Sequence, residues 1–266
     1  MHPVRIVSAN VNGIRAAQRR GGLTWLSASG ADVIALQEVR ANETQATKAM
    51  DGELIAEWSR ASEEGIAAGR AGVSILTPWP ILAERDSQVL GDVAGGRWIE
   101  ADIAVGDDKP VTVISAYVHT GEAGTGKQGE KYAFLQAITG RLKELRDQGA
   151  DVVLTGDMNI CHTDLDLKNT KGNVGKAGYL PQEQAYLSQW ADIGYVDAVR
   201  AIAGERPGPY SWWSWRGQAF DNDTGWRIDY QWASPALRAK DATIGRAASY
   251  ETRWSDHAPV VVDYER

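Results

Sequence analysis

Several features are scarce or absent in this chain of 266 residues, and each absence excludes a class of protein. A single cysteine, Cys161, cannot form an internal disulfide bond, so nothing in the chain requires an oxidising compartment. No run of about 18 apolar residues predicts a transmembrane helix. The opening stretch MHPVRIVSAN lacks the basic and apolar regions of a secretory signal. We therefore expect a cytoplasmic protein that does not enter a membrane.

The chain also lacks an excess of positive charge. Its formal net charge is −7 and its isoelectric point is near 5.2. This balance disfavours a protein held to nucleic acid by bulk charge, although it is compatible with a local basic surface. No linker, low-complexity tract or exact repeat divides the sequence. Strand-like and helical stretches alternate, which indicates one α/β domain over 1–266 with sheets packed against helices.

Two of the helical stretches are well marked. Leu135, Ile138, Leu142 and Leu145 recur at helical spacing within 130–148. A second helix is predicted to start near Pro181, because proline suits the first turn of a helix, and to run through PQEQAYLSQW.

What the chain does have is a recurring pattern of short apolar runs with chemically capable side chains at their ends. The stretches VRIVSANVNG, ADVIALQEV, VTVISAYVHT and DVVLTGDMNI each predict a strand that ends in such residues. Two further strands, in GWRIDYQWAS and SDHAPVVVDY, carry them near their beginnings. The residues concerned are Asn10, Asn12, Gln37, Glu38, Tyr117, His119, Asp157, Asn159, Asp229, Asp256 and His257.

Any one of these residues is adequately explained as a turn residue, as with Asp157 after Gly156. Turn formation does not explain why six strand ends carry acids, amides, a phenol and an imidazole together. If the ends converge, the site is rich in oxygen ligands and has no thiolate, which suits Mg²⁺ or Mn²⁺ better than zinc. Mg²⁺ usually binds through one or two carboxylates plus substrate phosphate, so the pattern indicates phosphoryl chemistry.

The motifs NVNGIRA, LQE, GDMN, GWRIDY and SDHAPV occur in a familiar order and spacing. Through them the chain resembles the exonuclease III family of abasic-site endonucleases, within the endonuclease/exonuclease/phosphatase superfamily, from about Val4 to Tyr264. SDHAP and GDMN are shared across the superfamily, whereas GWRIDY and DLDLKNTKGNVGKAGYLPQE are typical of its DNA-repair branch. The resemblance implies a four-layer α/β sandwich with two central mixed β-sheets flanked by helices.

The resemblance also implies a metal side and a nucleophile side of the site. Glu38 corresponds to the principal Mg²⁺ ligand, with Asp256 and Asn12 as supporting groups. Elsewhere in the family an Asp can stand at the position of Asn12, so a second metal ion becomes doubtful here. Asp157 corresponds to the residue that orients and activates the attacking water, and Asn10 holds it.

The remaining residues correspond to groups that contact the phosphate. Asn159 would position phosphate and water, and Tyr117 would lie beside the scissile phosphate as a stabiliser or a donor to the leaving group. His257, paired with Asp229, would contact a non-bridging phosphate oxygen, because an aspartate behind a histidine favours the cationic ring. After Tyr117 the family usually has a proline and then an amide. Here 118–120 reads Val-His-Thr, so that amide contact is replaced by His119 or Thr120, or lost.

Basic residues in loops that follow the strand ends predict contacts with the DNA backbone. For any one of them a solvated surface charge is the simpler interpretation, but their shared placement favours the group. They are Arg15, Arg19, Arg20, Lys127, Lys131, Lys168, Lys171 and Lys176. The resemblance places one more basic residue, Arg216, in a loop that would press into a groove of the DNA. Most of the 11 tryptophans are expected in the core. Trp212, Trp226 and Ile228 instead occupy positions at which the family lines its pocket for the base-less sugar.

The activity implied is that of a Mg²⁺-dependent DNA-repair phosphodiesterase, with Mn²⁺ able to substitute. It would cut double-stranded DNA on the 5′ side of an abasic site, trim blocked 3′ ends and act as a 3′→5′ exonuclease, as a monomer. Two alternatives stay open: the same site acting on inositol phosphates, sphingomyelin or RNA, and a catalytically inactive nucleic-acid-binding or regulatory relative. GWRIDY and the Lys-Gly loop oppose the first, and the intact strand-end set opposes the second.

Overall fold

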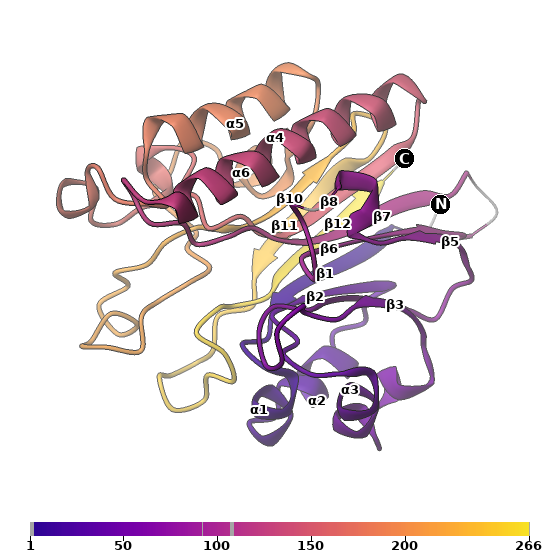
Figure 1. Ribbon diagram of the computed structural model, residues 1–266. Helices are drawn as coiled ribbons and strands as arrows, with labels where there is room; N and C mark the ends of the chain where they lie inside the picture. The colour runs from indigo at the N-terminus through magenta and orange to yellow at the C-terminus, as the bar shows by residue number, and fades with distance from the viewer. Residues whose placement is uncertain (1–2, 92, 107–108, 266) are drawn as a thin grey trace.

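Two six-stranded sheets pack against each other in the computed structural model, which describes residues 3–91, 93–106 and 109–265 (Figure 1). The first sheet has the order β11-β12-β1-β2-β4-β3. Its strands are β1 (Val4–Asn10), β2 (Val33–Gln37), β3 (Ser59–Glu63), β4 (Val73–Thr77), β11 (Arg238–Ile244) and β12 (Val260–Glu265). The second sheet has the order β5-β6-β7-β8-β10-β9. Its strands are β5 (Ile81–Arg85), β6 (Trp98–Ile103), β7 (Val111–Tyr117), β8 (Asp151–Asp157), β9 (Val196–Asp197) and β10 (Asp229–Ala233).

Helices cover the outer faces of both sheets, so the predicted four-layer α/β sandwich is confirmed (Figure 1). The helices against the first sheet are α1 (Ile14–Arg19), α2 (Gly22–Ser27) and α3 (Glu43–Met50). Those against the second are α4 (Gly126–Asp147) and α5 (Pro181–Asp192), while α6 (Ala198–Ala203) packs on β10 and β11. Short 3-10 turns are η1 (Leu54–Glu57), η2 (Ser87–Leu90), η3 (Asp164–Asp166) and η4 (Lys171–Asn173).

Both predicted helices are present. The helix predicted within 130–148 is α4, which begins earlier, at Gly126, and Pro181 opens α5 as expected. Within the part of the chain that the structure describes, no helix combines the length and the apolarity needed to cross a membrane.

Alternation of side chains along the strands produces three apolar layers. In β8, Val153 lies in the layer between the two sheets, whereas Leu154 faces the layer under α4 and α5. The third layer joins the first sheet to α1, α2 and α3. Because both faces of the central strands are covered, most of their residues are buried, and the strands read as largely apolar runs in the sequence.

The direction of the strands brings the polar strand ends to one edge. β1 runs parallel to β2, and β7 runs parallel to β8, so the four carboxyl ends share the edge of their sheet. β12 is antiparallel to β1 and β10 is antiparallel to β8, so the beginnings of β10 and β12 lie at the same edge. Asp229 is in fact paired in register with Asp157. The same antiparallel, parallel, antiparallel order recurs in both sheets, although no repeat is visible in the sequence.

The layered core predicts a large difference between two leucine substitutions. Leu154 is fully buried, whereas Leu82 on β5 is 59% exposed. Leu154→Ala removes buried methyl groups and leaves a cavity, so we expect it to lower the free energy of unfolding by about 2–5 kcal/mol. Leu82→Ala is the control and should change it by no more than about 0.5 kcal/mol. Urea denaturation of both variants measures this, and equal losses would contradict the layer assignment.

Candidate active site

The predicted site residues surround one cleft with a volume of about 340 Å³. Asn10 and Asp229 lie behind its wall, and both are buried. The cleft is lined by Asn12, Glu38, Arg40, Tyr117, Thr120, Asp157, Asn159, Ala177, Gly178, Trp212, Trp226, Ile228, Asp256 and His257. The convergence of the strand ends, which the sequence could only suppose, is therefore present.

A single buried amide joins the two sheets at this edge. Asn10 Nδ2 donates to Glu38 Oε1 at 2.9 Å and to Asp157 Oδ2 at 2.9 Å. Its Oδ1 accepts from the backbone N–H of Asn12 at 3.0 Å. Asn10 was predicted to hold Asp157, and in the structure it holds Glu38 as well.

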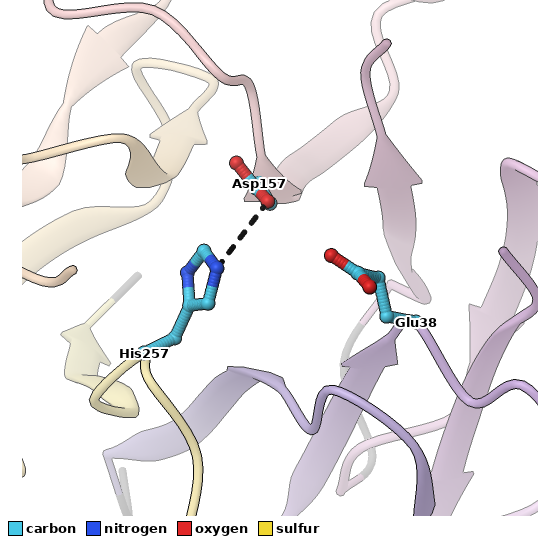
Figure 2. Close-up of side chains that lie close together, drawn as sticks. All are labelled: Glu38, Asp157 and His257. Carbon is cyan, nitrogen blue, oxygen red and sulfur yellow. Dashed lines mark ion pairs between the residues drawn. The ribbon is translucent and has the colours of Figure 1, made fainter. Parts of the chain in front are cut away.

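Glu38, Asp157 and His257 form a cluster able to hold a cation. One ligand atom from each lies within 4.8 Å of the others, and the side chains point toward one another (Figure 2). The Glu38 and Asp157 carboxylates lie close together and repel each other, so a hard cation with oxygen preference fits their oxygens. The other oxygen of Glu38 pairs with Arg40, which the sequence reading missed. Its only signal was its place two residues after Glu38.

Asp256 and Asn12 bind each other beside that cluster. Asn12 Nδ2 donates to Asp256 Oδ1 at 2.7 Å, and the indole N–H of Trp212 donates to Asp256 Oδ2 at 3.1 Å. Both carboxylate oxygens of Asp256 thus have a donor. The supporting role of this pair at a metal ion stays a prediction.

His257 is backed by Asp229, as predicted. Its Nδ1 lies 2.9 Å from Asp229 Oδ2, and its Nε2 lies 3.8 Å from Asp157 Oδ2. Ser211 Oγ donates to Asp229 at 2.6 Å and so fixes the carboxylate. Burial alone lowers the pKa of His257, but the charges of Asp229 and Asp157 outweigh it and raise the pKa to about 10. The ring is therefore a cation at neutral pH.

Burial acts on the pKa of Asp157 in the opposite direction, because this side chain is a carboxylate and is almost fully buried. Burial raises its pKa to about 8, and the neighbouring charges of Asp229 and Glu38 act in the same direction, against His257. The backbone N–H of Asn159 donates to Asp157 Oδ1 at 2.9 Å and orients the group. Asn159 itself is held through Nδ2, which donates to the carbonyl of Val118 at 2.9 Å.

Tyr117 is held against the cleft by Arg97. The Arg97 guanidinium lies 4.7 Å from the centre of the Tyr117 ring, and it donates to the Tyr117 carbonyl at 3.3 Å. Burial, together with the charges of Glu38 and Asp157, raises the pKa of Tyr117 well above its usual range. Its hydroxyl therefore keeps its proton and can act as a hydrogen-bond donor at neutral pH.

Backbone strain is concentrated in the same place. Asn12, Glu38 and Asn159 adopt left-handed conformations with φ of 46°, 51° and 50°. Such angles are uncommon for residues other than glycine, and they persist where surrounding contacts impose them. Here they turn the side chains at the ends of the strands into the cleft.

An apolar recess adjoins the ionic cluster. Trp212 and Trp226 are half-buried and meet edge to face, with ring centres 6.1 Å apart, and Ile228 is 5% exposed. The Trp212 ring also lies 6.5 Å from that of His257. The three residues predicted as pocket walls thus line the cleft together, and their role toward a substrate stays a prediction.

Comparisons with known proteins agree with this geometry. The profile of the Endonuclease/Exonuclease/phosphatase family matches residues 7–257. The chain is 32% identical to an exodeoxyribonuclease of Bacillus subtilis (strain 168), over 97% of this chain and 98% of that one. The chain belongs to the endonuclease/exonuclease/phosphatase family. It is also 28% identical to the DNA repair nuclease APEX1 of Danio rerio, over 97% of this chain and 81% of that one.

The structural comparison extends this family membership. A 3′ phosphatase from Neisseria, NExo, solved with a product DNA hairpin, has a TM-score of 0.85 and 25% identity, and the match covers 99% of this chain and 100% of that one. The likeness to the exonuclease III branch expected from the motifs is confirmed, and with it the assignment of this family member as an enzyme.

Most of the basic residues expected on the surface of this family member are exposed. These are Arg15, Arg19, Arg20, Lys127, Lys168, Lys171, Lys176 and Arg216. Lys127 is engaged by exposed Glu122 at 2.8 Å, and the Arg20 guanidinium lies 5.1 Å from the centre of the Trp215 ring. Their contact with DNA stays a prediction.

The prediction that Lys131 contacts the DNA backbone is wrong. It is 0% exposed and paired with buried Glu183, so it cannot contact a DNA backbone. Its position after the β7 strand end suggested a surface loop, but α4 has already begun there and turns Lys131 inward. Of the two residues expected to replace the missing amide, Thr120 lines the cleft. His119 packs edge-on against Phe134, with ring centres 5.6 Å apart, and is not among the lining residues.

The ion pair between His257 and Asp229 predicts that the His257 ring is charged in the metal-free enzyme. Because the pKa of His257 is raised, its ring stays doubly protonated as pH rises past the ordinary histidine value, up to about 10. Nitrogen NMR of the protein in EDTA at pH 8 should show an imidazolium. Asp229→Asn should lower this pKa because it removes the main favourable charge, and a neutral His257 in the wild type at pH 8 would contradict the assignment.

Proposed function

We propose that this enzyme is a Mg²⁺-dependent phosphodiesterase of DNA repair. It would cut double-stranded DNA on the 5′ side of an abasic site, remove blocking groups from 3′ ends and degrade DNA in the 3′→5′ direction. The observation that carries the proposal is that the Glu38 and Asp157 carboxylates, a cationic imidazole and apolar walls share one cleft. The names of the relatives, an exodeoxyribonuclease and a DNA repair nuclease, support the choice of DNA.

Asp157 is suited to take a proton from the attacking water. Asn10 and the Asn159 N–H hold its carboxylate in one orientation toward the cleft. Burial raises the pKa of Asp157, which makes its carboxylate a stronger base than that of an exposed aspartate. Asn159, which also lines the cleft, would position phosphate and water there.

His257 and Tyr117 are suited to the phosphate itself. The cationic His257 ring would contact a non-bridging oxygen and stabilise the charge that develops on it. Tyr117, with its proton retained, would donate to the departing 3′-oxygen or stabilise the phosphate beside it. Glu38 would hold Mg²⁺ with support from Asp256 and Asn12, and Mn²⁺ is expected to substitute. When bound, Mg²⁺ would add positive charge next to the phosphoryl oxygens.

DNA binding by a protein with a net charge of −7 requires local basic surface. Arg15 and Arg19 line a second cavity of about 380 Å³ together with Arg40, which also lines the main cleft. Lys176 directly precedes Ala177 and Gly178 in the cleft wall. These placements support a basic surface next to the cleft along which a DNA strand would run. A monomeric state and a cytoplasmic location are part of the proposal.

The central test is cleavage of a duplex with one abasic site. Wild-type protein should cut on the 5′ side with Mg²⁺ and should stop cutting in EDTA. Glu38→Ala should abolish Mg²⁺-dependent cleavage because it removes the principal ligand, and it should leave the fold intact because it also relieves repulsion from Asp157. Glu84→Ala, an exposed glutamate on β5, is the matched control and should cut normally.

Two outcomes of that test would refute parts of the proposal. Near-normal cleavage by Glu38→Ala at limiting Mg²⁺ would remove Glu38 from the metal site. Preference for an inositol phosphate, for sphingomyelin or for RNA over the abasic duplex, measured in a substrate panel, would leave the chemistry in place and overturn DNA as the substrate.

The apolar recess predicts selection of the lesion. A pocket with walls of Trp212, Trp226 and Ile228 would admit a sugar without a base and exclude an intact nucleotide. Trp226→Ala should therefore lower the ratio of abasic to undamaged cleavage while the protein stays folded, and Trp212→Ala should do the same. Trp212→Phe is the control, because it keeps an apolar wall and loses only the N–H bond to Asp256.

A core role for the tryptophans predicts a different result. Each alanine variant would then lose about 3–5 kcal/mol of stability and leave the cleavage ratio unchanged. Measuring the melting temperature and the ratio on the same preparations separates the two.

A further inference from the structure

A fully buried ion pair lies behind the cleft and takes no part in the chemistry described above. Lys131 of α4 and Glu183, in the first turn of α5, are both 0% exposed, with Nζ 2.6 Å from Oε1. Burying two charges carries a desolvation cost that their attraction often fails to recover. Since the attraction between the two charges does not by itself explain the pair, its other hydrogen bonds indicate its role in this fold.

Lys131 binds the two loops that follow the central strands of the second sheet. Its ammonium has three N–H donors, and three acceptors surround it. Besides Glu183, these are the carbonyl of Thr120 at 3.2 Å and the carbonyl of Asn159 at 2.9 Å. Thr120 follows β7, Asn159 follows β8, and both line the cleft. Lys131 thus holds the strained, left-handed Asn159, whose N–H orients Asp157.

Glu183 binds a third segment of the cleft wall. Its Oε2 accepts from the backbone N–H groups of Gly178 at 2.7 Å and Leu180 at 3.0 Å, and Oε1 accepts from Gln128 at 2.9 Å. Gly178 has φ of +87° and packs closely on Trp226, since a Cβ there would lie 2.9 Å from the indole ring. Glu183 therefore fixes the backbone against which one wall of the apolar recess rests.

We propose that the Lys131–Glu183 pair is a positioning device that aligns the loops of Thr120, Asn159 and Gly178 around the cleft. It acts through the backbone and touches no substrate, so it sets the turnover rate and leaves DNA affinity unchanged. This inference rests on the phosphodiesterase activity proposed above. Small displacements of groups around a reacting centre are costly, which is why such an indirect role is visible in kcat.

The double variant Lys131→Met/Glu183→Gln tests the proposal without leaving a buried charge unpaired. Methionine fills the volume, the new amide oxygen still accepts from Gly178 and Leu180, and Gln128 can turn to accept its N–H. The ion pair itself and the donation to the Thr120 and Asn159 carbonyls are lost. We expect kcat on an abasic duplex to fall by roughly 10-fold or more. The Kd for the same duplex in EDTA and the melting temperature should stay close to those of the wild type.

Lys131→Arg separates charge from geometry. It keeps the positive charge opposite Glu183, but a planar guanidinium cannot direct its donors as the tetrahedral ammonium does. We expect this variant to fold, to bind DNA normally and to lose turnover. Lys143→Met and Lys143→Arg are the matched controls, because Lys143 is exposed on the same helix, and they should change none of the three quantities.

Several results would overturn the positioning role. One is unchanged kcat in either folded Lys131 variant. Another is weaker DNA binding with a salt dependence that is shallower by about one phosphate contact, which would mark a backbone contact. Failure of both variants to fold would assign the pair to stability alone. Wild-type protein in the same assay separates the two proposals: an inactive wild type refutes the phosphodiesterase activity, whereas equal activity of wild type and variants refutes only the positioning role.

Discussion

Two carboxylates from different sheets are held close together inside this protein, and the site depends on that arrangement. Glu38 follows β2 in the first sheet, Asp157 ends β8 in the second, and both are buried. Buried carboxylates that face each other are costly unless donors and positive charges compensate for them. Asn10 donates one N–H to each of them, and Arg40 and His257 supply positive charge. The result is a site in which carboxylate oxygens suit a cation and positive side chains suit an anionic substrate.

The fold makes the arrangement possible through strand direction. Each sheet contains one parallel pair at its centre, β1 with β2 and β7 with β8, and the carboxyl ends of these pairs meet where the sheets join. The chain leaves that edge in loops, and polar side chains can occupy it without disturbing the apolar layers below. Left-handed residues at Glu38 and Asn159 then turn the chain so that acids face the cleft.

Buried ion pairs anchor the loops that this edge requires. Lys131 and Glu183 hold the loops that carry Asn159 and Gly178 in the cleft wall. On the other side, Asp166 pairs with buried Arg227 at 2.7 Å. Arg227 lies between Trp226 and Ile228 in the sequence, while Asp166 opens the segment that carries Lys168 and Lys171. The apolar recess and the segment that carries Lys168 and Lys171 are therefore fastened to each other.

Sequence reasoning reached much of this fold and site, because it depends on local patterns. Apolar runs marked β1, β2, β7, β8, β10 and β12, helical spacing marked α4, and Pro181 marked α5. The remaining strands, β3, β4, β5, β6, β9 and β11, were not predicted. β3, β5, β9 and β11 are short or half-exposed and have no comparable pattern. β4 and β6 are largely buried, and the prediction missed them. Of the strand-end set, all members except Gln37 and His119 lie around the cleft or directly behind it. Gln37 instead donates to Ser115 of β7, and His119 packs on Phe134.

By itself, the sequence determined which side chains are available and at which strand ends they stand. Only the tertiary structure decided which of them meet, because the type of a residue does not determine whether its side chain is buried or toward which element it points. Lys131 reads as a surface cation until the packing of α4 against α5 encloses it with Glu183. Arg40 reads as an ordinary loop arginine until the left-handed turn at Glu38 brings it onto that carboxylate. The charge state of His257 follows from the distance to Asp229, which antiparallel pairing of β10 with β8 and of β12 with β1 determines.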